Sequence, residues 1–465
     1  MDRSGWTFES SHHGTPRRRA LTLAMGLVAS GGGLAPSRAA AQGSGIPPVR
    51  TLGPIVAATT YPLAGLESIR PLSDGRVLVN DPVARRVLLF DSSLARATVI
   101  ADTTGGTKKA YGAQGGALFP YADDSSLFVD LASRAFLVIE PSGAIARVMA
   151  APPLPGGGAG IQYLRPGLYT PAVDLHGNIL ARGTPGGAGG RGARGAGAGA
   201  GPPAPDGTRV VSPDSTLIVR FNIESRKVDT VAWLMAPVRA AVWTTGPTGT
   251  PRQTVLANPM PLQDAWTLMP DGTVAVVREH DYHIDWVAPD GSITSSPKIP
   301  HDWVRVTDSA KAAMLDSART IDSTRAARMA ARIDSLVKVA RAEGRDVTTS
   351  ATGAVTIQTD GGGMVSYPPS APTPMIDAGA LPSYVSPFDQ AVSVPARADA
   401  DGNVWIEVAS PLVGGATYDV VDRHGALVDR IQIPGKTYLV GFGKGVAYLA
   451  AREGAGYSLG IARIR

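Results

Sequence analysis

The clearest pattern in the chain is a series of short apolar segments separated by polar turns. Residues 265–269 and 273–277 are two such segments, and residues 282–287 alternate between polar and apolar positions. Pro270-Asp271-Gly272 separates the first two segments, and Asp290-Gly291 follows the third. Asp-Gly dipeptides supply the positive φ angles that two-residue hairpins require. The pattern therefore predicts four antiparallel strands, the fourth beginning directly after the second Asp-Gly turn.

The same unit recurs along the chain. Further copies begin near the turn sequences Asp74-Gly75, Asp123-Asp124, His176-Gly177 and Asp401-Gly402. The His176 copy is interrupted and resumes at residues 217–221. Internal repetition indicates an architecture built from stacked units, and four-stranded units joined by hairpins are typical of β-propeller blades.

The two ends of the chain together offer one more unit. Residues 438–442, 446–450 and 457–462 supply only three strands, and residues 49–60 offer the missing fourth. A propeller closes its ring in this way, so that no sheet edge is left free to aggregate. We therefore expect an all-β, six-bladed β-propeller with four-stranded antiparallel blades, in which an N-terminal strand completes the last blade. Five or seven blades are the alternatives.

At this level the chain resembles the six-bladed propellers that include NHL-repeat and TolB-like proteins. Residues 418–425, 440–443 and 457–465 look like the closing blades of uncharacterised exported bacterial members. That group contains lyases, lactonases and pure binding modules, so the resemblance implies a fold and leaves the activity open.

The composition supports this architecture and restricts the classes of partner that the protein is expected to bind. The 465 residues include 55 Gly and 38 Pro, which favour many short strands and tight turns. The chain has no Cys, so it has no disulfide, thiolate metal site or Cys nucleophile. Removing the five Arg and two acidic residues of positions 1–41 leaves 39 basic and 37 acidic residues. This near-neutral balance gives no support to a nucleic-acid partner.

The first forty residues predict a cleaved leader. Arg17-Arg18-Arg19 precedes an apolar run at residues 20–29, and Ala39-Ala40-Ala41 fits a small-residue cleavage site. The run is shorter than the about 20 apolar residues that span a bilayer. Both a twin-arginine and a general secretory signal fit. We expect a periplasmic or secreted protein that begins near Gln42 and has no transmembrane segment in its mature form.

Two long segments interrupt the repeats within the propeller, which we assign to residues 42–465. Residues 183–205 are rich in Gly, Ala and Arg and are expected to form a disordered loop. Residues 302–390 predict a helical and Pro/Gly-rich insertion: one helix, or two broken near Asp322-Ser323, capped by Thr307 or Asp308 and ended by Gly344. The segment after the helix, 347–390, is expected to be irregular. The helix is either a strut or a lid.

The apolar positions of this predicted helix recur at steps of three and four residues, as expected for the face that packs on a neighbouring element. They are Met314, Ala318, Ile321, Met329, Ile333, Leu336 and Ala340.

In a propeller the long segments should all lie on one face, which we call the long-loop face. The turns between first and second strands and between third and fourth strands lie on the opposite, short-turn face. Polar residues at equivalent second-to-third turns are candidates for a ligand-binding rim. They are Asn80, Asp81, Asp130, Arg134, Arg182, Arg278, Glu279, His280, Asp281 and His283.

Two functions fit this sequence, and it does not decide whether the protein is an enzyme. The first is a binding or interaction module, expected to be a monomer, that holds a protein, peptide or glycan through its long-loop face. The alternative is a metal-assisted lyase or lactonase at the axial mouth, in which His280 or His283 would serve. No catalytic set, metal site or cofactor is assigned from the residues alone, and no cofactor motif identifies one.

Overall fold

The computed structural model describes most of the chain beyond the expected leader. The expected leader lies outside the described residues, as does nearly all of the expected 183–205 loop. The described residues are 45–103, 116–150, 164, 171–174, 176–183, 207–211, 214–225, 227–245, 251–350, 353–359, 363–367, 372–388, 394–409 and 414–464.

Four-stranded antiparallel sheets dominate the first part of the chain. Sheet 1 contains β3 (Ser68–Pro71), β4 (Val77–Asp81), β5 (Arg86–Phe90) and β6 (Ala97–Ala101). Sheet 2 contains β7 (Leu118–Pro120), β8 (Ser126–Asp130), β9 (Ala135–Ile139) and β10 (Ile145–Ala150), with the short 3-10 helix η1 (Ala122–Asp124) between its first two strands. Sheet 3 contains β11 (Ala172–Val173), β12 (Asn178–Gly183), β14 (Ser215–Asn222) and β15 (Val228–Met235). Sheet 4 contains β18 (Ala265–Leu268), β19 (Val274–Arg278), β20 (His283–Val287) and β21 (Ile293–Ser295).

The last two sheets each include a strand from the N-terminal part of the chain. Sheet 5 contains β25 (Ala396–Ala398), β26 (Val404–Val408), β27 (Thr417–Val421) and β28 (Leu427–Gln432), with β1 (Val49–Thr51) parallel to β28. Sheet 6 contains β29 (Thr437–Gly443), β30 (Val446–Glu453) and β31 (Gly456–Arg463), and β2 (Ile55–Ala58) pairs antiparallel with β31. The predicted pairing of residues 49–60 with the C-terminal strands is thus confirmed for β2. The parallel addition of β1 was not predicted.

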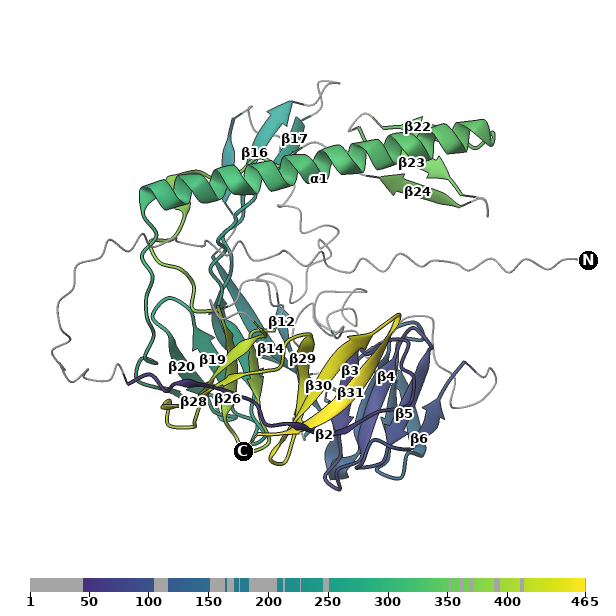
Figure 1. Ribbon diagram of the computed structural model, residues 1–465, viewed down its shortest axis with the longest axis vertical. Helices are drawn as coiled ribbons and strands as arrows, with labels where there is room; N and C mark the ends of the chain where they lie inside the picture. The colour runs from purple at the N-terminus through teal and green to yellow at the C-terminus, as the bar shows by residue number, and fades with distance from the viewer. Residues whose placement is uncertain are drawn as a thin grey trace, which may run out of the picture.

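The hydrophobic core runs between neighbouring sheets. Within the described residues, clusters of buried side chains join sheets 1 and 2, 2 and 3, 3 and 4, 4 and 5, 5 and 6, and finally 6 and 1. In Figure 1 the C-terminal strands β30 and β31 accordingly lie beside the N-terminal β3 and β4. Sheets that pack face to face in this order around a common axis form a β-propeller. This arrangement differs from a β-sandwich, in which two sheets face each other.

The hairpin turns adopt the geometry that the sequence predicts. Gly75, Gly272, Gly291 and Gly402 have φ angles between 85° and 89°, which side-chain-bearing residues rarely adopt. These glycines follow Asp in each case, and they close turns between first and second or third and fourth strands. The repeat pattern therefore located most strands of the ring.

A second layer stands over the ring (Figure 1). It contains the helix α1 (Asp308–Ala342), a sheet of β13 (Arg209–Val211), β16 (Ala240–Thr245) and β17 (Pro251–Val255), and a sheet of β22 (Val347–Thr349), β23 (Val355–Gln358) and β24 (Met364–Tyr367). Neither sheet was predicted, and the expectation of an irregular 347–390 segment is wrong for β22, β23 and β24. The short helix η3 (Ala378–Ala380) contacts α1. No helix among the described residues is both long and apolar enough to cross a membrane.

The helix α1 is continuous, so the break considered near Asp322-Ser323 is absent. The predicted inward face is partly wrong, because Ile321 and Met329 are 58% and 41% exposed. Ile333 and Ala340 are buried as predicted. Asp322 is also buried, because its carboxylate accepts hydrogen bonds from Thr373 N and from Arg325. The contact of Asp322 with the segment after the helix therefore acts together with the buried apolar side chains in orienting α1, and it leaves no trace in the apolar periodicity.

The N-terminus of α1 is capped as predicted, since Thr307 Oγ1 accepts a hydrogen bond from Ala310 N at 3.2 Å. We expect Thr307→Ala to destabilise this end of the helix by about 1 kcal/mol, because an amide of the first turn loses its acceptor. Hydrogen exchange should then be faster at Asp308 to Lys311 and unchanged in the ring. Thr307→Ser, which keeps the acceptor, should exchange like the wild type. Equal protection in both variants would contradict the capping role.

Candidate functional site

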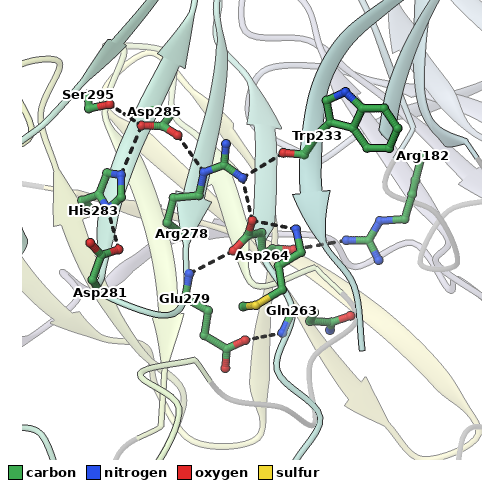
Figure 2. Close-up of polar contacts among 11 residues, drawn as sticks. Arg182, Trp233, Gln263, Asp264, Arg278, Glu279, Asp281, His283, Asp285 and Ser295 are labelled. Atoms are coloured by element: carbon green, nitrogen blue, oxygen red, sulfur yellow. Dashed lines mark hydrogen bonds and ion pairs between the residues drawn. The ribbon is translucent and has the colours of Figure 1, made fainter. Parts of the chain in front are cut away.

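A polar network on the long-loop face is centred on Asp264, which precedes β18 (Figure 2). This carboxylate is 3% exposed. It accepts hydrogen bonds from Arg278 Nη1 at 2.7 Å, Met235 N at 2.8 Å and Glu279 N at 3.1 Å. A buried carboxylate is tolerated only when such donors satisfy it. Asp264 thereby joins the end of sheet 3 to the second strand of sheet 4.

Arg278 connects this centre to a histidine on the next strand. Its Nε donates to Asp285 Oδ2 at 2.7 Å, and its Nη1 also donates to the Trp233 carbonyl oxygen at 2.8 Å. Flanked by two carboxylates, the guanidinium has a raised pKa even though its burial acts in the opposite direction. The ring of His283 lies between the carboxylates of Asp281 and Asp285, with Nδ1 2.7 Å from Asp281 and Nε2 3.1 Å from Asp285. Figure 2 shows this chain of contacts between the neighbouring strands β19 and β20 of sheet 4.

Arg182 and Trp233 lie at the other side of Asp264 (Figure 2). Arg182 Nη2 donates to the Asp264 carbonyl oxygen at 3.2 Å, and no carboxylate of the described residues lies within ion-pair distance of it. Burial lowers the pKa of this guanidinium, and the nearby Asp264 acts against the shift. The Trp233 side chain is 54% exposed although its backbone is fixed by Arg278. This side of the network therefore has guanidinium donors and an aromatic face available to a ligand.

The other rim candidates are mostly engaged within the fold. Asp81, fully buried, accepts from Gly65 N at 2.8 Å and forms an ion pair with Arg86. Asn80 donates to the Gly116 carbonyl oxygen at 2.5 Å. Asp130 accepts from Ser133 Oγ at 2.6 Å and from two turn amides, at Ala132 and Ser133. These contacts close turns and hold links between strands, and ligand binding by these residues stays a prediction.

The predicted equivalence of the rim positions is visible in the backbone. Asp81, Asp130 and Arg278 are each the last residue of a second strand. The residue four positions later is left-handed in each turn: Arg85, Arg134 and Tyr282, with φ angles of 50°, 52° and 49°. Arg134 is exposed. The three turns therefore share one geometry but carry different side chains.

Glu279 and His280 have opposite environments although they are adjacent. Glu279 is buried, and its carboxylate accepts a hydrogen bond from Gln263 N. His280 is exposed. His280 and His283 therefore differ in surroundings, and only His283 belongs to the network. Among the residues that the structure describes, no three His, Asp or Glu side chains are grouped so that they could hold a metal ion.

Sequence reasoning missed Asp264, Asp285 and Trp233. Asp285 and Trp233 lie inside strands, where a polar or aromatic side chain fits the usual alternation of exposed and buried positions and so does not stand out. Asp264 lies just before a strand, outside the second-to-third turns that the repeat pattern marks. A buried acid directly before an innermost strand was the only signal, and burial could not be read from the sequence.

A second buried polar cluster joins sheets 4 and 5. Tyr282 Oη donates to Asp419 Oδ2 at 2.8 Å, and Arg430 Nε donates to Asp419 Oδ1 at 2.9 Å. Burial raises the pKa of Tyr282 well above its usual value, with Asp419 acting in the same direction, so the phenol stays a donor. Burial also raises the pKa of Asp419. The His301 ring meets that of Tyr282 edge to face, with centroids 5.4 Å apart, and burial lowers the pKa of His301.

The raised pKa of Asp419 predicts a pH-dependent effect of Asp419→Asn. Because the carboxyl has a higher pKa in the folded chain than its ordinary 3.8, its ionisation disfavours folding. That penalty is absent well below pH 3.8 and grows as the pH rises through the folded pKa. The free energy of unfolding of the variant, relative to wild type, should therefore shift in the variant's favour as the pH rises from 4 to 8. Urea unfolding across this pH range measures the shift, and a shift of opposite sign would contradict it.

The chain is similar to several solved structures at low identity. No family model matches the chain, and no curated protein matches it. Similar solved structures include a gluconolactonase from Xanthomonas campestris, 14% identical, covering 89% of this chain and 99% of that one, with a TM-score of 0.33. A virginiamycin B lyase from Staphylococcus aureus is 13% identical over 88% and 98%, also with a TM-score of 0.33. Regucalcin, a calcium-binding protein from Agrobacterium tumefaciens, is 13% identical over 90% and 98%, with a TM-score of 0.29.

Proposed function

We propose that this chain is an exported binding module built on a ring of six blades. The six sheets, the clusters that join each sheet to the next, and the β2–β31 pairing support the blade number. The basic and apolar leader pattern with its Ala39-Ala40-Ala41 site supports export. N-terminal sequencing of the protein recovered from the periplasm or medium tests this. A first residue near Gln42 is expected, and recovery of an intact leader from the cytoplasm would contradict it.

The ligand surface is the Arg182 and Trp233 side of the Asp264 network. The observation that carries the proposal is an exposed indole and a guanidinium with spare donors on the same sheet, where the Trp233 carbonyl oxygen accepts from Arg278 and Arg182 donates to the Asp264 carbonyl oxygen. Trp and Arg are the side chains that most often contribute large binding energies, because each combines a flat apolar surface with directional donors. A peptide, protein or glycan segment could place a flat or apolar group on Trp233 and an acceptor on Arg182.

Selection of ligands from a glycan array and a displayed peptide library tests this proposal. Ligands retained by the wild type should lose about tenfold or more of their affinity on Trp233→Ala, and about tenfold on Arg182→Gln. Arg96→Gln, at an exposed turn on the short-turn face, is the matched control and should bind like the wild type. Retained affinity in both rim variants, or no ligand from either library, would count against the proposal.

The second candidate is a metal-assisted lyase or lactonase that uses His280 or His283. The observation in its favour is that His283 Nδ1 already meets the Asp281 carboxylate, a partner that orients metal-binding imidazoles. His283 Nε2 faces Asp285, so a metal ion would have to displace that contact. Metal analysis of protein purified without chelator separates the two functions. A stoichiometric divalent ion that is lost on His283→Ala would favour the enzyme.

A further inference from the structure

The axis of the ring contains a cavity of about 1060 Å³ on the side of the short turns. Its walls come from the first strand of every sheet: β3, β7, β11, β18, β25 and β29. Its mouth is formed by the turns that follow these strands, where Ser73, Asp271, Asp401 and Lys444 are exposed. Pockets for small ligands commonly measure about 300–1,000 Å³. The cavity is therefore large enough for a small molecule, and it lies on the face opposite to the Asp264 network.

Most charged groups of this cavity are committed to one another or to the turns. Arg70 Nη2 donates to Asp124 at 2.8 Å, and Asp271 accepts from Arg423 at 2.8 Å. Asp174 and Asp399 each accept hydrogen bonds from the backbone amides of their own turns. These interactions hold turns of sheets 1 to 5 in place, and they leave few charges for a ligand.

Arg397 is different from the other cations of the wall. Within the described residues its guanidinium has no hydrogen bond and no ion pair, although the side chain is half-buried and lines the cavity. Its neighbours Ala396 and Ala398 pack against the core shared by sheets 4 and 5. Since successive side chains of a strand point to opposite faces, Arg397 projects away from that core. A guanidinium in this position is suited to a bidentate contact with a carboxylate.

The mouth provides the opposite charge. Asp401 is exposed in the turn directly after β25, and no described residue donates to its carboxylate. The carboxylates of Asp174 and Asp399 also lie at the mouth, whereas Lys444 is the exposed cation there. This excess of acidic groups disfavours a polyanion such as a phosphate ester. A ligand with one carboxylate for Arg397 and one amine for Asp401 matches both charges.

The walls between these charges are largely apolar. Leu268, Met269 and Phe442 contribute to them, and Phe442 is held by the Trp405 ring at a centroid distance of 4.9 Å. We propose that the axial cavity binds a small zwitterion that carries an amine, a carboxylate and an apolar body, such as an apolar amino acid or a dipeptide with free ends. This site is independent of the surface proposed above for Arg182 and Trp233.

Calorimetric titration with four probes tests the proposal: L-leucine, L-leucyl-L-leucine, N-acetyl-L-leucine and L-leucinamide. At least one of the two zwitterions should bind more tightly than the acetylated acid and the amide, which each lack one charge. Arg397→Gln should weaken binding of that zwitterion by about 10- to 100-fold, because a charge-assisted bidentate contact is lost. Asp401→Asn should reduce the advantage of the zwitterion over the acetylated acid.

Arg452→Gln, the same change at an exposed position on β30, is the matched control and should leave affinity unchanged. Arg397→Lys keeps the charge but not the fork, and should give intermediate affinity. Circular dichroism and thermal unfolding of each variant show whether the ring is intact, which is expected because Arg397 makes no ion pair with any residue that the structure describes. The proposal is overturned if neither zwitterion binds at millimolar concentration, if all four probes bind equally, or if folded Arg397→Gln protein binds like the wild type.

Discussion

Asp264→Ala is expected to destabilise the protein by about 3–5 kcal/mol. The substitution leaves the amides of Met235 and Glu279 without their acceptor in a buried setting. It also removes the ion pair of Asp264 with the guanidinium of Arg278. Removing one partner of a buried pair costs about 3–5 kcal/mol because the remaining charge and donors stay desolvated. Arg278 keeps Asp285 as a partner, which places the expectation at the lower end of this range.

Urea unfolding followed by tryptophan fluorescence measures this effect. Asp281→Ala is the matched control, because Asp281 is at the edge of the same network and partly exposed, and among the described residues its carboxylate pairs with His283 and Lys298 alone. Exposed ion pairs contribute little, so the control should lose at most about 1 kcal/mol. If Asp264→Ala were as stable as Asp281→Ala, the network would not be centred on Asp264.

A chain that begins at Tyr61 is expected to lose the closure of its ring. This truncation removes β1 and β2, and with them the pairing to β28 and β31 and the ion pair of Arg50 with Asp429. The lost hydrogen bonds, at about 1 kcal/mol each, amount to on the order of 5 kcal/mol. The exposed edges of β28 and β31 become templates for pairing with other chains. We therefore expect a lower melting temperature and large soluble or insoluble aggregates.

Size-exclusion chromatography with light scattering, together with thermal unfolding, measures both effects. A chain that begins at Gly45 is the control, since it keeps both strands. It should behave as the full-length mature protein does. A monomeric Tyr61 chain with an unchanged melting temperature would show that β1 and β2 are not needed for closure.

The strands of the ring could be predicted because their signals are local. An Asp-Gly turn such as Asp271-Gly272 fixes a hairpin within a few residues, and the flanking strands repeat it along the chain. The pairing of β2 with β31 could also be predicted from the sequence. The last repeat has only three strands, and the N-terminal part of the chain has one strand that belongs to no other repeat. The sheets β13–β16–β17 and β22–β23–β24 could not be predicted from the sequence, because each occurs once and has no repeat to mark it.

The candidate site was predicted only in outline. The turn positions were found correctly, but their side chains have unequal surroundings: Asp81 is fully buried whereas His280 is exposed. Burial there depends on which neighbouring loop covers the turn, as Gly65 covers Asp81, and such contacts are distant in sequence. The charge of Arg397 was visible in the sequence, but only the three-dimensional arrangement shows that no described residue pairs with it.

The pairing of Ile55 with Ala462 has a consequence for the order of folding. Residues at nearly opposite ends of the chain must meet, and such non-local contacts form late because the entropy of closing the intervening loop is lost first. Until synthesis reaches β31, β2 has no template, and a newly made chain is an open arc. At high concentration an arc can accept β2 from a neighbour instead of its own, which makes strand exchange between copies the expected misfolding route of this protein.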